Sequence, residues 1–407
     1  MPKPLNIMLG AVPFGCRNVG DEAILECSVN VFRELCPDCR ITVSTGDEND
    51  TSLKLGLDTC DLFGFSASYN RQRLLEVLRQ QDVFIWCGAT GLSDYPEDAL
   101  EILRAAQEAG TKTVLWAVGM NSRLNPVKYE VLPGKRRTLL SLMTKCSLGL
   151  VDAIALDEWR RKRRARRKIA KYLDAADLII LRDTESRDEV LKCGVTREII
   201  VGADSALLLE PTPFDRVRLT ETVTAALASD VKKVGVCVST SAPDLKDVPG
   251  FIRYLDCMVE DGSAAVVLLP MDPAVDAALM AEMRARMARP ERAVIVEGKY
   301  EPAEVLAILS KLDVAVSSRL HMLILASIVD VPIVGISPGS KMDSFMRPFG
   351  LKPVGTVEDW DFDLLCNETK RLLDEKTAFA GRSRVVRKDL MARLATAKER
   401  LRQVLIA

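Results

Sequence analysis

The chain has 407 residues, of which 48% are hydrophobic and 28% charged, and its formal net charge at pH 7 is −1. These proportions exclude a disordered or membrane-embedded chain, and the near-neutral charge gives no general attraction to nucleic acid. The length is sufficient for two domains of ordinary size. The apolar run at residues 5–9 is too short for a signal peptide and no later run reaches the length of a membrane span, so we expect a cytoplasmic protein.

The first half of the chain alternates predicted strands and helices. Strands are expected at residues 5–10, 41–44, 82–88, 113–119 and 178–181, with one more ending near Val201, and helices at 24–32, 74–78, 99–110 and 182–194. The first strand enters a helix through a glycine turn, as a Rossmann-like unit does, but the dinucleotide fingerprint is absent and NAD is not expected. Residues 121–133 are predicted to form a long surface loop.

The alternation starts again after the proline-rich stretch 210–215, which we interpret as a linker. Strands are expected at residues 234–239, 265–269, 294–297, 314–317 and 332–335, helices at 248–259, 274–287, 302–311 and 321–328, and a helical tail from 362 onward. Two such series predict two doubly wound, Rossmann-like α/β domains facing a cleft. We place them at residues 1–212 and 213–372, with the tail at 373–407.

Residues of the early turns are candidates for binding an acceptor or an anion. Gly20 permits the turn after the first strand, while Asn18 and Asp21 flank it; Asp21 caps the helix, or the loop amides hold an anion or sugar hydroxyls, and both readings stay open. After the strand at 82–88, the chain continues through Gly88 and Gly91 to Asp94. Asp94 is a candidate general base, with a helix cap as the alternative.

A basic run follows in the middle of the chain, at Trp159, Arg160, Arg161, Arg163 and Arg164. We predict that it forms the front of a helix. The run is either a solvated helix face or a contact with an anionic membrane or a polyprenyl-diphosphate carrier. Nucleic acid is not expected, because no recognition motif accompanies the charge.

The eleven cysteines do not indicate a metal site. Most lie within predicted strands or helices, where cysteine is a small core residue. Cys36 and Cys39 are the one close pair, and without a second pair they lack the four ligands of a structural zinc. We interpret them as part of a turn between a helix and a strand, and we predict no metal.

Three basic residues and the only histidine lie where an anion would bind. His321 and Arg319 fall in the turn between the strand at 314–317 and the helix at 321–328. In open parallel sheets, ligands bind at the carboxyl ends of strands, where helix N-termini also point. Arg182 follows another strand and is either a second anion clamp or a partner of Asp183. Lys341 is a candidate anion contact or an exposed lysine.

The amino-acid sequences of several of these segments resemble those of a known family. Arg319-Leu-His321 is followed by Ile324-x-Ala326, then by Val331-Pro-Ile333 and Lys341; the chain also contains Asn18-Val-Gly-Asp-Glu22, Arg182-Asp183-x-x-Ser186 and the glycines around Asp94. Together these resemble the polysaccharide pyruvyltransferase family, which adds pyruvate ketals to sugars of bacterial and yeast polymers. Ala89 and Thr90 interrupt the run of glycines usual in that family, so we expect the fine shape of the pocket to differ from the family's.

The resemblance implies a GT-B type architecture and a reaction without a cofactor. Phosphoenolpyruvate would be the donor and a sugar or lipid-linked oligosaccharide the acceptor, so the enzyme could work at the inner face of the membrane. Arg319, Arg182 and Lys341 would hold the donor, His321 would act as general acid and Asp94 as general base. The alternatives are a GT-B glycosyltransferase using a nucleotide sugar, a related epimerase, and a sugar- or lipid-carrier-binding protein without activity.

Overall fold

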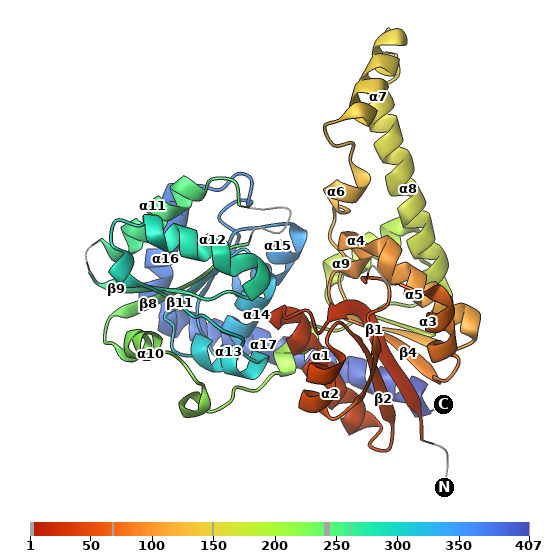
Figure 1. The fold of residues 1–407 in the computed structure, drawn as a ribbon, viewed down its shortest axis with the longest axis horizontal. Coiled ribbons are helices and arrows are strands. Elements are labelled where there is room, and N and C mark those ends of the chain that lie inside the picture. Colours follow the sequence, from red (N-terminus) through yellow and green to blue (C-terminus); the bar gives the residue numbers. More distant parts are fainter. Residues whose placement is uncertain (1–3, 67–68, 149, 240–244, 261, 407) are drawn as a thin grey trace.

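The structure is a computed structural model that describes residues 4–66, 69–148, 150–239, 245–260 and 262–406. Its described strands form two separate parallel sheets, of seven and five strands. Figure 1 shows the sheets in two lobes that lie side by side. We call them the N-terminal lobe and the C-terminal lobe.

The N-terminal lobe contains the larger sheet, in the order β3-β2-β1-β4-β5-β6-β7. Its strands are β1 (Asn6–Phe14), β2 (Arg40–Thr45), β3 (Asp58–Asp61), β4 (Val83–Cys87), β5 (Lys112–Val118), β6 (Leu178–Leu181) and β7 (Ile200–Val201). The helices between them are α1 (Val19–Leu35), α2 (Glu48–Leu55), α3 (Arg71–Leu78), α4 (Gly91–Asp94), α5 (Pro96–Ala109), α6 (Pro126–Tyr129), α7 (Lys135–Cys146), α8 (Ala153–Asp174) and α9 (Thr184–Cys193). The strand order reverses between β1 and β4, so the loops after these two strands open a crevice.

The C-terminal lobe repeats this plan with the order β10-β9-β8-β11-β12. Its strands are β8 (Lys232–Cys237), β9 (Ala264–Leu268), β10 (Ala293–Ile295), β11 (Val314–Ser317) and β12 (Ile333–Gly335). Its helices are α10 (Glu221–Ala228), α11 (Val248–Val259), α12 (Pro273–Arg286), α13 (Pro302–Leu309), α14 (Leu320–Ile328), α15 (Ser340–Met346) and α16 (Phe362–Asp374). Here the order reverses between β8 and β11. The predicted fold class, two doubly wound domains, is therefore confirmed.

A long last helix, α17 (Lys376–Ile406), crosses between the lobes. Its first half binds the C-terminal lobe, where the Ser383 hydroxyl donates to the Ser327 carbonyl over 2.8 Å. Its second half packs on β6 and β7, where Ala397 is fully buried. The predicted helical tail thus joins the two lobes.

Helices α7 and α8 pair into a hairpin that projects from the N-terminal lobe (Figure 1). The basic run that begins at Trp159 was predicted to form the front of a helix. It lies further along instead, because α8 already begins at Ala153. The Asp152 carboxylate sets this start by accepting hydrogen bonds from the amides of Ile154 and Ala155, both over 3.0 Å.

The segment 121–133 also differs from its predicted structure, a surface loop. It contains α6, and its side chains Leu124, Tyr129 and Val131 are buried. The Asn125 amide nitrogen donates to the Asp94 carbonyl over 2.9 Å, which ties the segment to α4. Apolar side chains at these positions therefore have a core to enter, so the predicted surface loop describes only part of the segment.

Candidate active site

A cavity of about 460 Å³ lies between the lobes, at the carboxyl ends of both sheets. Its wall comes from the loops that follow strands of each sheet, where open α/β folds bind ligands. Seven of the predicted site residues line it: Asn18, Asp21, Asp94, Arg182, Arg319, His321 and Lys341. The two series of strand-helix units thus contribute to one cavity.

His321 enters the cavity from the first turn of α14, in close contact with α1 of the other lobe. A Cβ atom on Gly20 would lie only 2.2 Å from the His321 Nδ1 atom. Residue 20 therefore has to lack a side chain for the two helices to come this close. Near this contact, the Val19 amide donates to the Met271 carbonyl over 2.8 Å. Gly20 is not among the described residues that line the cavity; it makes room for the histidine.

Asp204 is the acidic partner of His321. Its Oδ2 lies 3.6 Å from His321 Nε2 and 3.5 Å from Arg182 Nη1. Neither Asp204 Oδ2 nor His321 Nε2 has a hydrogen-bond partner within the described part of the chain. Burial alone would raise the pKa of Asp204, but His321, Arg182 and the Ala206 amide outweigh it, so this pKa lies below its ordinary value. The buried carboxyl group of Asp204 is therefore charged where it faces the imidazole of His321.

Arg319 precedes α14 and is held by two carboxylates from the C-terminal lobe. Its Nη2 lies 2.7 Å from Asp276 Oδ1 and 3.9 Å from Asp272 Oδ2. Burial would lower the pKa of Arg319, but the bond to Asp276 outweighs it and the pKa is raised. The guanidinium is thus a fixed positive charge in the wall, beside the positive end of the α14 dipole.

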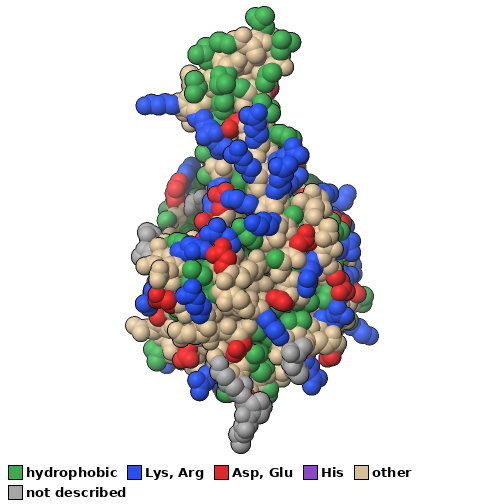
Figure 2. Space-filling view, turned by 90° about the vertical axis from the view of Figure 1, so that its right-hand side faces the viewer, with side chains coloured by type: hydrophobic (Ala, Val, Ile, Leu, Met, Phe, Trp, Pro, Cys, Tyr) green, Lys and Arg blue, Asp and Glu red, His purple; other side chains and the backbone are tan. Residues whose placement is uncertain are grey.

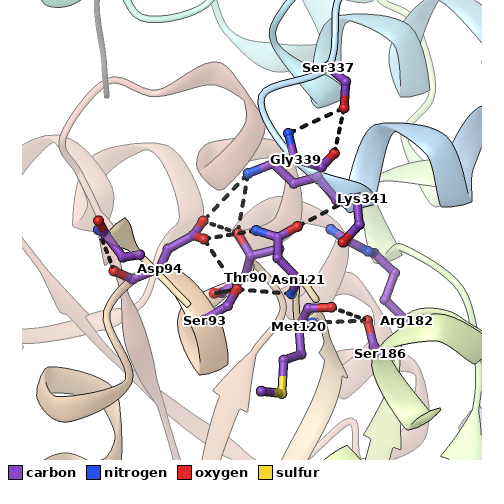
Figure 3. A network of polar contacts seen from close by, with 12 residues as sticks. Thr90, Ser93, Asp94, Met120, Asn121, Arg182, Ser186, Ser337, Gly339 and Lys341 are labelled. Carbon is purple, nitrogen blue, oxygen red and sulfur yellow. Dashed lines mark hydrogen bonds and ion pairs between the residues drawn. The ribbon is translucent and has the colours of Figure 1, made fainter. Parts of the chain in front are cut away.

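Asp94 and Lys341 form a bridge between the lobes (Figure 3). Lys341 Nζ lies 3.5 Å from Asp94 Oδ2, and the Lys341 amide donates to Asn121 Oδ1 over 3.2 Å. The same Asp94 carboxylate accepts from the Asn121 amide over 2.9 Å and from the hydroxyls of Thr90 and Ser93. Asp94 is the last residue of the one-turn helix α4, which follows β4. Asp94 therefore lies one helical turn beyond the loop at the end of that strand. Its carboxylate is oriented by many partners.

Asp21 is a buried carboxyl group in the cavity wall. The Asn18 side chain accepts from the Gly20 amide over 3.0 Å and so caps α1; Asp21 is not the cap. Burial raises the pKa of Asp21 to about 6, even though His321, Arg319 and Lys341 lower it. Burial and the nearby Asp21 raise the pKa of the neighbouring Glu22 to about 7. Asp21 can therefore gain or lose a proton near neutral pH.

The glycines predicted for the second loop have packing roles. Gly88 has a φ of +63°, and a Cβ there would lie 2.9 Å from Ile24 Cγ2. A Cβ on Gly91 would lie 2.7 Å from the Trp86 ring. Among the described residues neither glycine lines the cavity; Ala89 and Thr90, between them, do.

Comparison with models of protein families identifies the family of this chain. The model of the polysaccharide pyruvyl transferase family matches residues 18–340. The chain belongs to this family. The segments that carried the resemblance, from Asn18 to the loop before Lys341, all lie within the match or directly after it, so the sequence-based recognition is confirmed. No curated protein matches the chain in sequence.

Solved structures that are similar confirm the GT-B type fold of this family member. Anabaena Alr3699/HepE in complex with UDP and glucose has a TM-score of 0.60 at 12% identity, covering 98% of this chain and 99% of that one. S. aureus MnaA with UDP has a TM-score of 0.59 at 11% identity, over 93% and 90%. A glycosyltransferase from Rickettsia africae has a TM-score of 0.57 at 10% identity, over 99% and 98%. At these identities the likeness concerns the fold alone.

Three residues of the site were not predicted from the sequence: Asn121, which lines the cavity, and Asp204 and Asp276, which pair with His321 and Arg319 of its wall. Asp204 directly follows a predicted strand, which was a usable signal because the neighbouring strand ends were already treated as site positions. Asp276 ends the stretch Leu269-Pro270-Met-Asp-x-x-x-Asp276, which also resembles the family, but its contact with Arg319 appears only in the structure, where Asp276 is wholly buried on α12. Asn121 carried no signal, because it lay in a segment interpreted as a loop.

Proposed function

We propose that this transferase moves the enolpyruvyl group of phosphoenolpyruvate onto two hydroxyls of one sugar in a polysaccharide or its lipid-linked precursor, which forms a pyruvate ketal and releases phosphate. The observation that carries the proposal is the position of His321. The chain's only histidine lines the cavity, faces a charged Asp204 and has three basic side chains of the same cavity around it.

The donor is an anion with a carboxylate and a phosphate, and the cavity offers cations for both. Arg182 and Arg319 present planar guanidinium groups, and Lys341 adds an ammonium group from α15. Each of the three already has a carboxylate partner, which fixes its orientation before the donor binds. We assign donor binding to these residues.

The first chemical step needs an acid at the methylene carbon of the donor. In our proposal His321 gives its proton to this carbon, which leaves an oxocarbenium-like centre at the neighbouring carbon. A sugar hydroxyl attacks that centre and loses its proton to a carboxylate of the wall. The bond between carbon and phosphate oxygen then breaks, phosphate leaves, and the second hydroxyl of the sugar closes the ketal and releases its proton.

Two carboxylates can accept the proton of the attacking hydroxyl. Asp94 is one, although its present bond to Lys341 has to loosen when the donor takes the lysine. Asp21 is the other, because its raised pKa of about 6 suits a group that exchanges protons near neutral pH. Asp94→Asn and Asp21→Asn separate them: the variant of the true base should lose about 10²- to 10⁴-fold in kcat.

Calorimetric titration with phosphoenolpyruvate and, separately, with UDP tests the proposed donor. We expect saturable binding of phosphoenolpyruvate that Arg319→Ala weakens by about tenfold or more, since a charge-assisted pair is lost. His321→Ala should leave this binding largely intact and reduce turnover by about 10²- to 10⁴-fold. Near-normal turnover in His321→Ala would show that another group supplies the proton.

A nucleotide-sugar transferase is the second candidate, because solved structures of the same fold are described with UDP bound. In that case Arg319 and Lys341 would hold a diphosphate, and His321 would orient a sugar. Binding of UDP without binding of phosphoenolpyruvate would favour this candidate and refute the first.

A further inference from the structure

We propose that the α7–α8 hairpin docks the protein onto the surface of an anionic lipid membrane. By hairpin we mean residues 135–164; by tip, the apolar side chains at its far end; and by shaft, the basic side chains below them. The tip inserts among the lipids while the shaft lies against the headgroups. The sequence indicated only the basic run at Trp159 as a possible contact, and the apolar partner of that charge appears in the structure.

The hairpin has no core of its own. None of the α7 side chains is buried, and the buried side chains of α8 lie only at Ala165 and beyond. Apolar side chains nevertheless cover the far end: Leu139, Leu142, Met143, Leu148, Leu150 and Val151 are exposed, the last two leucines by 90% and 87%. Figure 2 shows hydrophobic side chains gathered over this end of the projection. A contiguous exposed apolar patch indicates an interaction surface.

The shaft carries the complementary feature, a dense positive charge. Residues 135–164 contain nine Lys and Arg against three Asp and Glu, a net charge of +6 in a chain whose total is −1. Arg160 and Arg164 have no acidic partner among the described residues, while Arg163 lies over the exposed Trp159 ring, 4.9 Å from its centre. In Figure 2 the basic side chains form a band directly below the apolar tip.

An apolar tip next to a basic shaft matches the surface of an anionic bilayer. The tip can reach the acyl chains while the shaft stays at the level of the charged headgroups. A second copy of this chain fits less well, since contact through the tips would bring two strongly positive shafts together. Nucleic acid would satisfy the charge and leave the leucines exposed. Among the described residues no helix is long and apolar enough to cross a bilayer, so the contact is with the surface.

The hairpin is continuous with the cavity wall. Arg123, Asn125 and Pro126 line the cavity, and the chain runs from them through α6 directly into α7. A docked hairpin would therefore hold the cavity close to the membrane, where a lipid-linked acceptor resides. This last link rests on the proposed function, whereas the docking itself does not.

Sedimentation with phosphatidylcholine vesicles, with and without phosphatidylglycerol, tests the docking. We expect the full-length protein to bind the vesicles that contain phosphatidylglycerol and to be released by high salt. Leu148→Glu/Leu150→Glu should weaken binding by about tenfold or more, because two apolar anchors become charged. Arg160→Glu/Arg164→Glu should also weaken it by about tenfold or more, and should remove most of its dependence on phosphatidylglycerol.

Matched controls use side chains of the same kind elsewhere on the surface. Leu53 and Val385 are 86% and 72% exposed on other helices, so Leu53→Glu/Val385→Glu should bind vesicles as the native protein does. Arg216→Glu/Arg402→Glu, at exposed arginines outside the hairpin, controls for the change in net charge. All variants should bind phosphoenolpyruvate equally, which separates a failure of docking from a failure of the proposed function.

Three outcomes would overturn the proposal. The first is native binding that does not depend on phosphatidylglycerol, and the second is tip or shaft variants that bind as the native protein does. The third is a dimer, detected by light scattering, that dissociates in Leu148→Glu/Leu150→Glu while native protein ignores vesicles. That result would make the hairpin a contact between subunits.

Discussion

Asp21 shows how burial gives a single residue chemical use and a thermodynamic cost. Its carboxyl group is buried in the cavity wall, and its pKa is raised to about 6 from an ordinary value of 3.8. Because the folded protein binds this proton more tightly than the unfolded chain, the protonated form favours folding. The stability that it contributes is complete below about pH 4 and is lost as the pH rises through about 6.

Asp21→Asn should therefore stabilise the protein at alkaline pH. At pH 8 we expect the free energy of unfolding to rise by about 3 kcal/mol, since two pKa units correspond to that amount, and at pH 4 the difference should nearly vanish. Urea unfolding of both proteins between pH 4 and pH 8 measures it. Asp38→Asn, at an exposed site, controls for the loss of one carboxylate. A difference that is the same at both pH values would contradict the raised pKa.

At the scale of elements, the approach of α1 to α14 positions the histidine. Gly20→Ala tests it, because the added Cβ would lie 2.2 Å from His321 Nδ1 and one helix or the imidazole has to move. We expect turnover to fall by about tenfold or more, even though alanine favours a helix by about 1 kcal/mol over glycine. Steady-state kinetics and thermal unfolding together separate a displaced histidine from an unfolded protein.

The control for this prediction is Gly381→Ala on α17. Nothing lies within 4 Å of a Cβ built at Gly381, so the same change in a helix meets no obstacle there. It should raise the free energy of unfolding by about 0.5–1 kcal/mol and leave turnover unchanged. If Gly20→Ala behaved like this control, the tight contact would have no bearing on catalysis.

The elements that were predictable from the sequence are those with an apolar pattern and a marked end. Most central strands were located in this way, and with them the loops that carry His321 and Arg319. The strand β3 was missed because Asp-Thr-Cys-Asp is short and polar and lies at the sheet edge. The bridge from Asp94 to Lys341 could not be predicted, since it joins residues far apart in the chain across the cavity.

At the scale of the whole molecule, α17 joins both lobes, and its contact with the first sheet is tight. Ala397 is fully buried there, and a Cβ on Gly202 would lie 3.4 Å from the Ala397 Cβ atom. Ala397→Leu should lower the free energy of unfolding by about 1–3 kcal/mol through overpacking. The control is Ala395→Leu. Ala395 lies two residues earlier on α17 and is exposed, so its substitution should have little effect. Equal unfolding curves for the two variants would mean that α17 does not pack there as described.

The course of α17 also affects how the protein can be made. Strands β6 and β7 leave the ribosome early, but the helix that covers them is synthesised about 200 residues later, a delay of roughly 10 to 40 s at ordinary rates of translation. During that interval the nascent N-terminal lobe lacks the helix that packs on β6 and β7 in the folded protein. The order of the sequence therefore leaves this part of the sheet without its covering helix until the last residues have been made.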